Sequence, residues 1–509
     1  MSKIIKLLAL IIIVISTFFA SWFAIHKDIV FHTDIARDFL LIEDVVRNKP
    51  ITLIGPRSGG IPGVFHGPLW TYINVPAFIL GNGNPAVVGW FWVVLYVVDI
   101  FIIYKVGKLI FSQEVGLLAA ALTAIATAFS VPGFFNPFGA VFMAPIFIYF
   151  LYRYIQKKKK KDLLLGLFSL GLAIQFQMAF GVPILVLLLP VLLFFIIKNK
   201  KYSHIAAFLI LLIPLSTFIL FDLKHQFLQT HSVINYLTGK ENSGKVDKPF
   251  SDILNSRIHS IIHDGPGFVT QDNQWLLLIF GVIMVYGLYK VFTEKKYRDK
   301  RSFYLLLLYL YVGYWLMTVL YKGQMWGYYY WPFLALVALF FTSFYEVIDK
   351  KLFIIIFLVF VIFGLNVQYK NNFKPVGYFG HDGSSWLFNY NAAKLIFADA
   401  PSEFGYYVFT ADQYGYPPQY AMHYTQTQYK NKKSFPYVKM ATTYLMIAPS
   451  NNPTIDDGWW KKEKVKIDKK PDKVFTFPGS NFRIEKYTLT PAEVANKSDD
   501  TLIHTLIFR

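Results

Sequence analysis

A group of charged residues suited to acid–base chemistry follows the first long apolar segment, 7–25: Asp34, Arg37 and Asp38. On a helix, residues three and four positions apart lie on one face, so Arg37 and Asp38 share a face with Asp34. A carboxylate at the edge of a membrane, partly removed from water, can accept a proton from a hydroxyl group. Two other interpretations stay open. Asp34 is simply the N-cap of the helix, and Arg37 with Asp38 forms an ordinary surface ion pair.

Cationic side chains stand at the ends of two later apolar segments. Lys224 and His225 follow the segment 205–221 directly, and Lys322 follows 303–320. Cations at such positions can hold an anionic group such as a phosphate. Lysine side chains at the ends of membrane spans also extend toward the interface without binding a ligand. Both interpretations fit these three residues.

Several uncharged polar residues are further candidates for binding a polar ligand. His66 lies in the sequence FHGP, where a lone histidine is either a ligand contact or structural. Gln175 and Gln177 lie near the end of an apolar segment. Such amides face the interior of a helix bundle or hydrogen-bond to neighbouring helices. Tyr328 lies in a run of tyrosines that is typical of an interfacial aromatic belt, or that lines a binding cavity.

The composition excludes most classes of soluble protein. The 509 residues are 55% hydrophobic and 16% charged, whereas soluble domains average roughly 25% charged residues. The mean hydropathy is +0.42. The absence of cysteine excludes disulfides, iron–sulfur clusters and thiol catalysis. No metal-ligand motif is found, so the sequence indicates no metal ion and no certain cofactor.

The elements that must position these residues are membrane-spanning helices. Crossing a membrane takes roughly 20 predominantly apolar residues, and the sequence contains about eleven such runs. They centre on residues 7–25, 87–104, 115–131, 138–151, 163–176, 182–197, 205–221, 275–292, 303–320, 329–345 and 352–367.

The loops between these runs predict the orientation. Lys and Arg gather in alternate loops, which places those loops and the N-terminus in the cytoplasm. The same bias accounts for much of the net charge of +19 without a nucleic acid partner. The opposite side then holds a first outside loop (26–86), a second outside loop (222–274) and the C-terminal region (368–509). The sequence therefore predicts a multi-pass protein of the plasma membrane with an extracytoplasmic C-terminal domain.

The C-terminal region, 368–509, differs in kind from the transmembrane region, 1–367. Short apolar stretches at 405–410 and 442–448 are typical of buried strands, and 386–400 and 416–429 are predicted helices. Alternating strands and helices indicate an α/β domain.

The first outside loop has a pattern of its own. Residues 35–47 carry apolar side chains at helical spacing, which predicts an amphipathic helix able to lie on a membrane surface. Pro50 ends this helix, and a stretch rich in Gly and Pro follows. A second apolar run, 69–80, then returns toward the bilayer.

These motifs and their order resemble the GT-C superfamily of polyprenyl-phosphate-sugar-dependent glycosyltransferases, in particular the protein O-mannosyltransferase and lipid A aminoarabinose transferase group. Asp34 and Arg37 match the first acid and the arginine that the family places after its first span, whereas Ile35 replaces its second acid. The resemblance covers roughly residues 1–370. Its other motifs are LIGP (53–56), FHGPLWTY (65–72), FFNP (134–137), FDLKHQF (221–227) and GYYYWP (327–332).

The resemblance implies a bundle of spans with surface helices in the first outside loop. It implies transfer of a sugar, with inversion, from a polyprenyl-phosphate carrier to a lipid, glycan or protein acceptor at the outer face. Asp34 would be the catalytic base. The candidates for binding the substrate or its phosphate, amid membrane lipid, are Arg37, Asp38, His66, Gln175, Gln177, Lys224, His225, Lys322 and Tyr328. The alternatives are a transporter or flippase of a lipid-linked sugar, and a cell-wall-binding scaffold.

Overall fold

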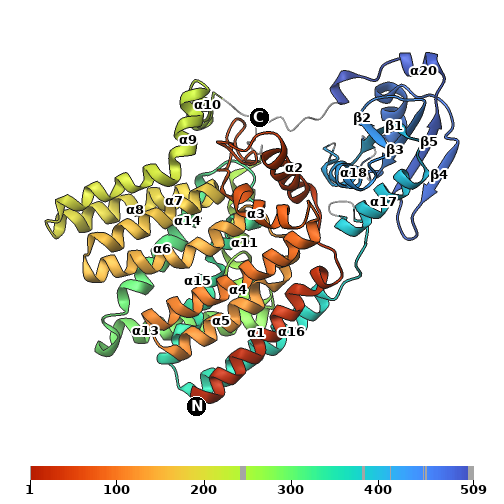
Figure 1. Cartoon of the computed structure of the whole chain (residues 1–509). Coiled ribbons are helices and arrows are strands. Elements are labelled where there is room, and N and C mark those ends of the chain that lie inside the picture. Colours follow the sequence, from red (N-terminus) through yellow and green to blue (C-terminus); the bar gives the residue numbers. More distant parts are fainter. Residues whose placement is uncertain are drawn as a thin grey trace. The chain divides into compact units, whose positions relative to one another are not determined.

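The computed structural model describes residues 2–240, 248–380, 384–412, 414–450, 452 and 455–502. The chain forms two compact units, each assembled from separate stretches of sequence. The first unit comprises Met1–Trp22, Ile51–Ile73 and Trp92–Phe373, and the second comprises Phe23–Pro50, Asn74–Phe91 and Lys374–Arg509. Figure 1 labels the elements along the chain. The predicted first outside loop, residues 26–86, is therefore shared between the two units.

The multi-pass architecture predicted from the sequence is confirmed. Among the described residues, nine helices are long and apolar enough to cross a membrane. They are Lys3–Ile25, Pro85–Ile110, Gln113–Gly133, Pro137–Lys157, Met178–Lys198, Tyr202–Lys224, Gln274–Thr293, Arg301–Leu320 and Lys350–Asn372. The two other predicted spans, 163–176 and 329–345, are also helical, in shorter helices that extend over Lys160–Phe176 and Trp331–Glu346.

The helices of the membrane region follow one another with short connections. They are α1 (Ser2–Ile25), α3 (Leu69–Leu80), α4 (Pro85–Ile110), α5 (Gln113–Thr127), η1 (Ala128–Gly133), α6 (Pro137–Lys157), α7 (Lys160–Phe176), α8 (Met178–Lys198), η2 (Tyr202–Leu211), α9 (Leu212–Lys224), α13 (Gln274–Thr293), η3 (Lys295–Tyr297), α14 (Arg301–Leu320), η4 (Gly327–Tyr329), η5 (Trp331–Phe333), α15 (Leu334–Ser343), η6 (Phe344–Glu346) and α16 (Lys350–Asn372). Helices α6, α7 and α8 run side by side (Figure 1).

Polar side chains join three of these helices inside the first unit. The amide nitrogen of Gln368 in α16 donates to the carbonyl oxygens of Ala124 and Ile125 in α5, over 3.2 and 2.9 Å. Ser16 in α1 donates to the Gln368 side-chain oxygen over 3.2 Å. Because α5 is rich in alanine, its neighbours can approach closely enough for such bonds.

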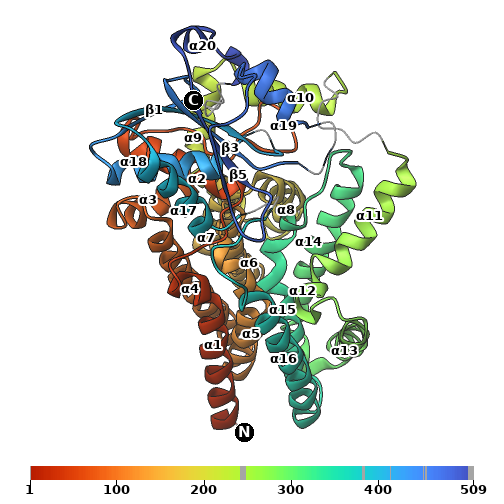
Figure 2. The same cartoon turned by 90° about the vertical axis from the view of Figure 1, so that its right-hand side faces the viewer.

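Three helices occupy the predicted second outside loop: α10 (Leu228–Leu237), α11 (Phe250–His263) and α12 (Pro266–Thr270). Helix α11 packs against α14, and Figure 2 shows the two side by side. The bend between α11 and α12 follows from Gly265 and Pro266, since a proline is tolerated at the first position of a helix.

The second unit contains a five-stranded sheet, which confirms the predicted C-terminal α/β region. Its strands are β1 (Glu403–Phe409), β2 (Lys433–Pro436), β3 (Thr442–Ile447), β4 (Lys473–Thr476) and β5 (Arg483–Thr488), in the order β2-β1-β3-β5-β4. Strand β1 is parallel to both β2 and β3, while β5 is antiparallel to β3 and β4. Its helices are α2 (Thr33–Arg47), α17 (Trp386–Asp399), α18 (Tyr416–Gln428), α19 (Asp457–Trp459), η7 (Trp460–Val465), α20 (Pro491–Ala495) and η8 (Asp500–Leu502).

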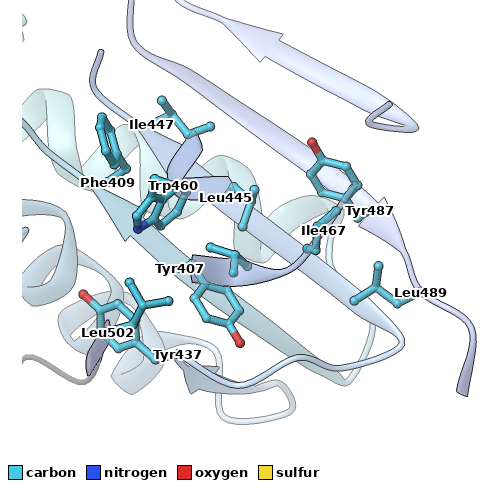
Figure 3. Packing of buried hydrophobic residues seen from close by; sticks show 11 residues of the cluster. Tyr407, Phe409, Tyr437, Leu445, Ile447, Trp460, Ile467, Tyr487, Leu489 and Leu502 are labelled. Atoms are coloured by element: carbon cyan, nitrogen blue, oxygen red, sulfur yellow. The ribbon is translucent and has the colours of Figure 1, made fainter. Parts of the chain in front are cut away.

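The sheet is covered on both faces. On one face, alternate residues of β1 and β3 pack against Trp460 and the chain after it. Figure 3 shows this cluster, which includes Tyr407, Phe409, Leu445, Ile447, Tyr487 and Leu502. On the other face, Phe404 of β1 contacts Phe397 of α17, with ring centroids 5.1 Å apart. A parallel strand covered on both faces is apolar along its whole length, which is why 405–410 could be recognised in the sequence.

Candidate functional site

Helix α2 carries the candidate base, and a histidine begins it. The Nδ1 atom of His32 accepts a hydrogen bond from the backbone N–H of Asp34, at 3.2 Å, so His32 is the N-cap. The interpretation of Asp34 as the N-cap is therefore wrong, and Asp34 lies inside the first turn. Burial lowers the pKa of His32, which keeps the Nδ1 lone pair available for this bond.

An ion-pair network joins the three charged residues on this helix. Arg37 Nη1 lies 2.6 Å from Asp34 Oδ1, and its Nη2 lies 2.9 Å from Asp38 Oδ1. The predicted helix is confirmed, and its three charges share one face. The pairs differ in burial, since the Asp34 side chain is 44% exposed and the Asp38 side chain 5%. Of the two carboxylates, that of Asp34 is the more exposed.

The electrostatics of the network follow from this burial. Burial raises the pKa of Asp38 to about 6, although the neighbouring Arg37 opposes the rise. Burial alone would lower the pKa of Arg37, but the two carboxylates outweigh it and raise that pKa. Arg37 is therefore a permanent cation that fixes the orientation of Asp34.

The segment before α2 is anchored to the C-terminal part of the second unit. The buried carboxylate of Asp28 accepts hydrogen bonds from the backbone N–H groups of Gly377 and Leu387, both at 2.8 Å. The backbone N–H of Trp386 donates to the carbonyl of Ile29 at 3.0 Å. The segment between α1 and α2 and the start of α17 are thereby joined by hydrogen bonds.

Helix α2 itself packs on α18. The rings of Phe39 and Tyr420 lie 5.3 Å apart, and His423 Nδ1 lies 3.0 Å from Glu43 Oε2. The helix that carries Asp34 is thus part of the folded C-terminal unit, an association that the sequence analysis did not predict.

The motifs that carried the resemblance meet in the first unit. The backbone N–H of Gly67, in FHGP, donates to the carbonyl of Gln175 at 2.8 Å. A Cβ atom on Gly67 would overlap the Gln175 side chain, so this approach requires glycine. The side chain of Asn136, in FFNP, donates to the carbonyl of Phe176 at 2.8 Å. Tyr328, in GYYYWP, is half-buried and contacts the ring of Phe135 at 5.4 Å.

The two glutamines differ in their surroundings. The Gln175 amide nitrogen donates to the hydroxyl of Thr217 in α9 at 2.8 Å and to the carbonyl of Pro214. This matches helix-to-helix bonding, the second interpretation made from the sequence. Gln177 is fully buried, and its amide atoms form no hydrogen bond with the described residues.

The other sequence-predicted binding residues of the first unit are placed differently. His66 is buried, and its backbone pairs with Pro56 and Gly55 across a tight loop. Lys224, His225 and Lys322 are exposed. The ring of His225 stacks on Phe221 at 4.1 Å, and none of the three cations lies in a buried polar site.

Helix α11 contains a buried cation that was not predicted from the sequence. The Arg257 side chain is 4% exposed, and its guanidinium donates to the carbonyl oxygens of Thr318, Tyr321 and Gly323 over 2.9 to 3.2 Å. No carboxylate in the described ranges forms an ion pair with it. Burial lowers the pKa of Arg257, which reflects the cost of removing this charge from water. The sign of this buried cation in the sequence is one arginine among the apolar positions of residues 250–263.

The surroundings of Arg257 include the first outside loop. The hydroxyl of Tyr321 donates to the carbonyl of Gly60 at 3.3 Å, and the backbone carbonyl of the same tyrosine accepts from Arg257. One tyrosine thus connects the Gly/Pro-rich stretch with the buried guanidinium. Across the described ranges, no group of three or more His, Asp or Glu side chains is arranged to hold a metal ion.

Comparisons with known proteins agree with the sequence resemblance. Residues 66–221 match the family model described as dolichyl-phosphate-mannose-protein mannosyltransferase. No curated protein matches the sequence.

Two solved structures of one enzyme have the same fold as this chain. ArnT from Cupriavidus metallidurans in its apo state is 9% identical, with a TM-score of 0.60, over 95% of this chain and 97% of ArnT. The same enzyme bound to undecaprenyl phosphate is 10% identical, with a TM-score of 0.58, over 98% and 99%. The Archaeoglobus fulgidus oligosaccharyltransferase is 15% identical, with a TM-score of 0.49, and this chain covers 61% of its length while 81% of this chain is aligned. The resemblance and the ArnT-like fold predicted from the sequence are confirmed.

Proposed function

We propose that the chain is a membrane glycosyltransferase that takes its sugar from a polyprenyl phosphate, with Asp34 as its catalytic base. The acceptor is a hydroxyl group of a lipid, glycan or protein at the outer face of the plasma membrane. In this proposal the N-terminus is cytoplasmic and the reaction inverts the anomeric carbon. The observation that carries the proposal is one half-exposed carboxylate, Asp34, held by a buried arginine at 2.6 Å.

Asp34 is better suited to the role than its neighbour Asp38. A general base must come within hydrogen-bond distance of the proton that it removes. Both carboxylates are bound to Arg37, but the Asp38 side chain is only 5% exposed, whereas that of Asp34 is 44% exposed. Asp38 therefore acts on Arg37, and Arg37 orients Asp34. Fixed orientation matters because a small misplacement of a reacting group slows the reaction by about 10²-fold.

Arg257 is the cation that we assign to the donor phosphate, in place of Lys224, His225 and Lys322. A buried charge is costly unless it is paired, and three carbonyl oxygens supply dipoles without an opposite charge. An anionic ligand would complete the neutralisation. The guanidinium of Arg257 is also held rigidly, so little conformational entropy of this side chain is lost when the anion binds.

The proposed step transfers the sugar from the donor phosphate to the acceptor oxygen. The acceptor hydroxyl gives its proton to Asp34, and its oxygen forms a bond to the anomeric carbon. The bond between that carbon and the phosphate oxygen breaks, and the electron pair leaves with the polyprenyl phosphate. The released monoester carries more negative charge than the diester, since the second pKa of a phosphate monoester is about 6. A fixed guanidinium therefore stabilises the transition state more than the bound donor.

The test uses purified full-length protein and radiolabelled polyprenyl-phosphate sugars with crude envelope acceptors. The measured quantities are released polyprenyl phosphate and labelled product. We expect turnover by the unaltered protein and a loss of about 10²- to 10⁴-fold in Asp34→Asn, the range for removal of a general base. Turnover that is equal in both would eliminate Asp34 as the base.

A matched control separates chemistry from folding. Asp44→Asn makes the same change on the same helix, at a carboxylate that accepts a bond from the Asn48 side chain at 2.9 Å. We expect this variant to retain most of the activity. A second variant, Asp34→Glu, keeps a carboxylate and should retain part of the activity that Asp34→Asn loses.

A further inference from the structure

A pocket in the second unit lies at the carboxyl ends of two parallel strands. Thr410 follows β1 directly, and Ala448 follows β3. In open α/β sheets, ligands bind outside the carboxyl ends of the strands, where connections leave in opposite directions. The chain from β1 turns through α18 to β2 on one side, while β3 lies on the other side of β1. We call this hollow the strand-end pocket.

The start of helix α2 forms one wall of the strand-end pocket. His32 and Thr33 both line it, and the Thr33 hydroxyl donates to the carboxylate of Asp412. Asp34 is the next residue along the same helix turn. A ligand in the pocket is therefore held at the end of α2 that carries the proposed base.

The pocket combines hydrogen-bonding groups with an apolar wall. Its polar side chains include those of Thr33, Ser384, Asn389 and Asp412, and its apolar wall includes Phe379 and Phe482. The two phenylalanine rings lie 5.7 Å apart. The hollow is partly open, since its roughly 420 Å³ of atom-free space includes open solvent, so a ligand bound there would keep part of its surface in water.

The charge of the pocket narrows the class of ligand. The Asp412 carboxylate is bound by hydroxyl and backbone donors, from Thr410 at 2.5 Å and Tyr414 at 3.1 Å. Within the described residues, no lysine or arginine forms an ion pair with it. An anionic ligand would be repelled, and a purely apolar one would leave the polar side chains unpaired. A neutral sugar ring suits both parts of the pocket. Its hydroxyl groups can pair with the polar side chains, and its C–H face can pack against the phenylalanine rings.

We propose that the strand-end pocket binds a neutral pyranose of the acceptor, so that the acceptor is a glycan or a glycolipid. The proposal rests on the proposed function, because it places that sugar at the start of α2, the helix that carries Asp34. Hydroxyl groups of the sugar donate to Asp412 and Asn389, while its C–H face packs against the phenylalanine wall. The donor phosphate is excluded from this pocket by the charge of Asp412.

The first experiment measures sugar binding alone. Full-length protein is purified in lauryldimethylamine oxide, because maltoside detergents carry sugar head groups that would compete. Methyl pyranosides of glucose, galactose, mannose and N-acetylglucosamine are the probes, and saturation-transfer NMR is the readout. We expect at least one of them to bind, and Asp412→Asn to weaken that binding about tenfold, as for a lost charge-assisted hydrogen bond.

A second pair of variants guards against a merely structural effect of Asp412. Ala448→Phe fills the pocket with a bulky side chain without removing a polar partner, and should also weaken binding about tenfold. Ala441→Phe makes the same change at the exposed amino end of β3, away from the pocket, and should leave binding unchanged. No binding of any probe, or equal binding in all four proteins, would overturn the proposal.

A donor assay separates this proposal from the proposed function. Slow release of polyprenyl phosphate to water, without acceptor, needs Asp34 and the donor site but no acceptor sugar. We expect Ala448→Phe to keep this hydrolysis and to lose transfer to the glycan acceptor. Loss of both activities in Ala448→Phe would contradict the pocket assignment. Hydrolysis that persists in Asp34→Asn would count against the base while leaving the sugar-binding result intact.

Discussion

The two units of the molecule hold their key charges in opposite ways. In the second unit, Arg37 is paired with two carboxylates, and one of them remains 44% exposed. In the first unit, Arg257 is 4% exposed and is held only by backbone carbonyls of the described residues. The first arrangement is a neutralised network with one partly exposed carboxylate, and the second is a fixed cation that has no carboxylate partner among the described residues.

This difference fits two separate roles in the proposed reaction, removal of a proton and binding of a phosphate. A proton acceptor needs an accessible carboxylate, and a buried arginine can orient it without blocking it. A lipid phosphate enters from the membrane, and a cation that already had a carboxylate partner would attract it less. Neutral carbonyl dipoles orient a guanidinium and leave its charge available. The two charges therefore suit the different roles that the proposed mechanism gives to Asp34 and Arg257.

The strongest test of this division is Arg257→Ala. We expect kcat/KM for the donor to fall about 10²- to 10³-fold, as for loss of a fixed donor to developing charge. Inhibition by free polyprenyl phosphate should weaken with it. Lys322→Ala is the control, because Lys322 is exposed and lies in the same segment as the carbonyls that hold Arg257. An equal effect of both substitutions would show that burial does not distinguish the two cations.

Arg37→Lys tests the orienting role in the second unit. A lysine ammonium cannot bind Asp34 and Asp38 in the geometry of a planar guanidinium. We expect kcat to fall about tenfold with the donor KM unchanged, since only the orientation of the base is altered. Steady-state kinetics at varied donor concentration measures both constants. A rise in KM alone would indicate that Arg37 binds the donor instead.

Asp28→Asn tests whether α2 depends on the C-terminal region. One amide nitrogen would face a backbone N–H of Gly377 or Leu387, leaving a buried donor without an acceptor. We expect a loss of about 1–3 kcal/mol in the stability of the second unit, seen as faster hydrogen exchange in both α2 and α17. Asp468→Asn, at an exposed ion pair with Lys462, should change little. Faster hydrogen exchange in α17 alone would show that the stability of α2 does not depend on this contact.

Asp399→Asn gives the smallest effect and a distinct pH dependence. Burial alone would raise the pKa of Asp399, but bonds from Lys486, Tyr444 and Lys473 lower it to about 2. Because the folded pKa lies below the unfolded value, the carboxylate stabilises the fold above pH 4. That contribution is lost as the pH falls toward 2. We expect about 1 kcal/mol of destabilisation near neutral pH, measured by thermal unfolding, and a smaller difference from the unaltered chain at pH 2.

Much of the fold could be predicted from local patterns in the sequence. Apolar runs revealed nine helices of spanning length, and 405–410 and 442–448 revealed two central strands. What local patterns could not show is the pairing of distant segments. The contact of Phe31 with Trp386, at 5.3 Å, joins residues more than 350 positions apart. No periodicity within either segment predicts that pairing.

The candidate site was predictable to a similar degree. Asp34, Arg37 and Asp38 could be grouped because helical spacing decides which side chains share a face. His32 was missed as the N-cap because Asp is a preferred residue there and histidine is not. Arg257 was missed because its burial depends on carbonyls at the end of another helix, α14. The cations chosen instead, such as Lys224, were selected by their position in sequence and are exposed.

The anchoring of α2 by residues 384–428 has a consequence for the synthesis of the protein. Helix α2 leaves the ribosome early, but its partners α17 and α18 are made more than 300 residues later. At about 5–20 residues per second, roughly 20 to 70 s pass before α2 can pack on them. During that interval the apolar face of this amphipathic helix, which includes Phe39, is not yet covered by α17 and α18. An amphipathic helix of this kind can lie on a lipid surface in the meantime, and its packing is completed only when α17 and α18 have been made.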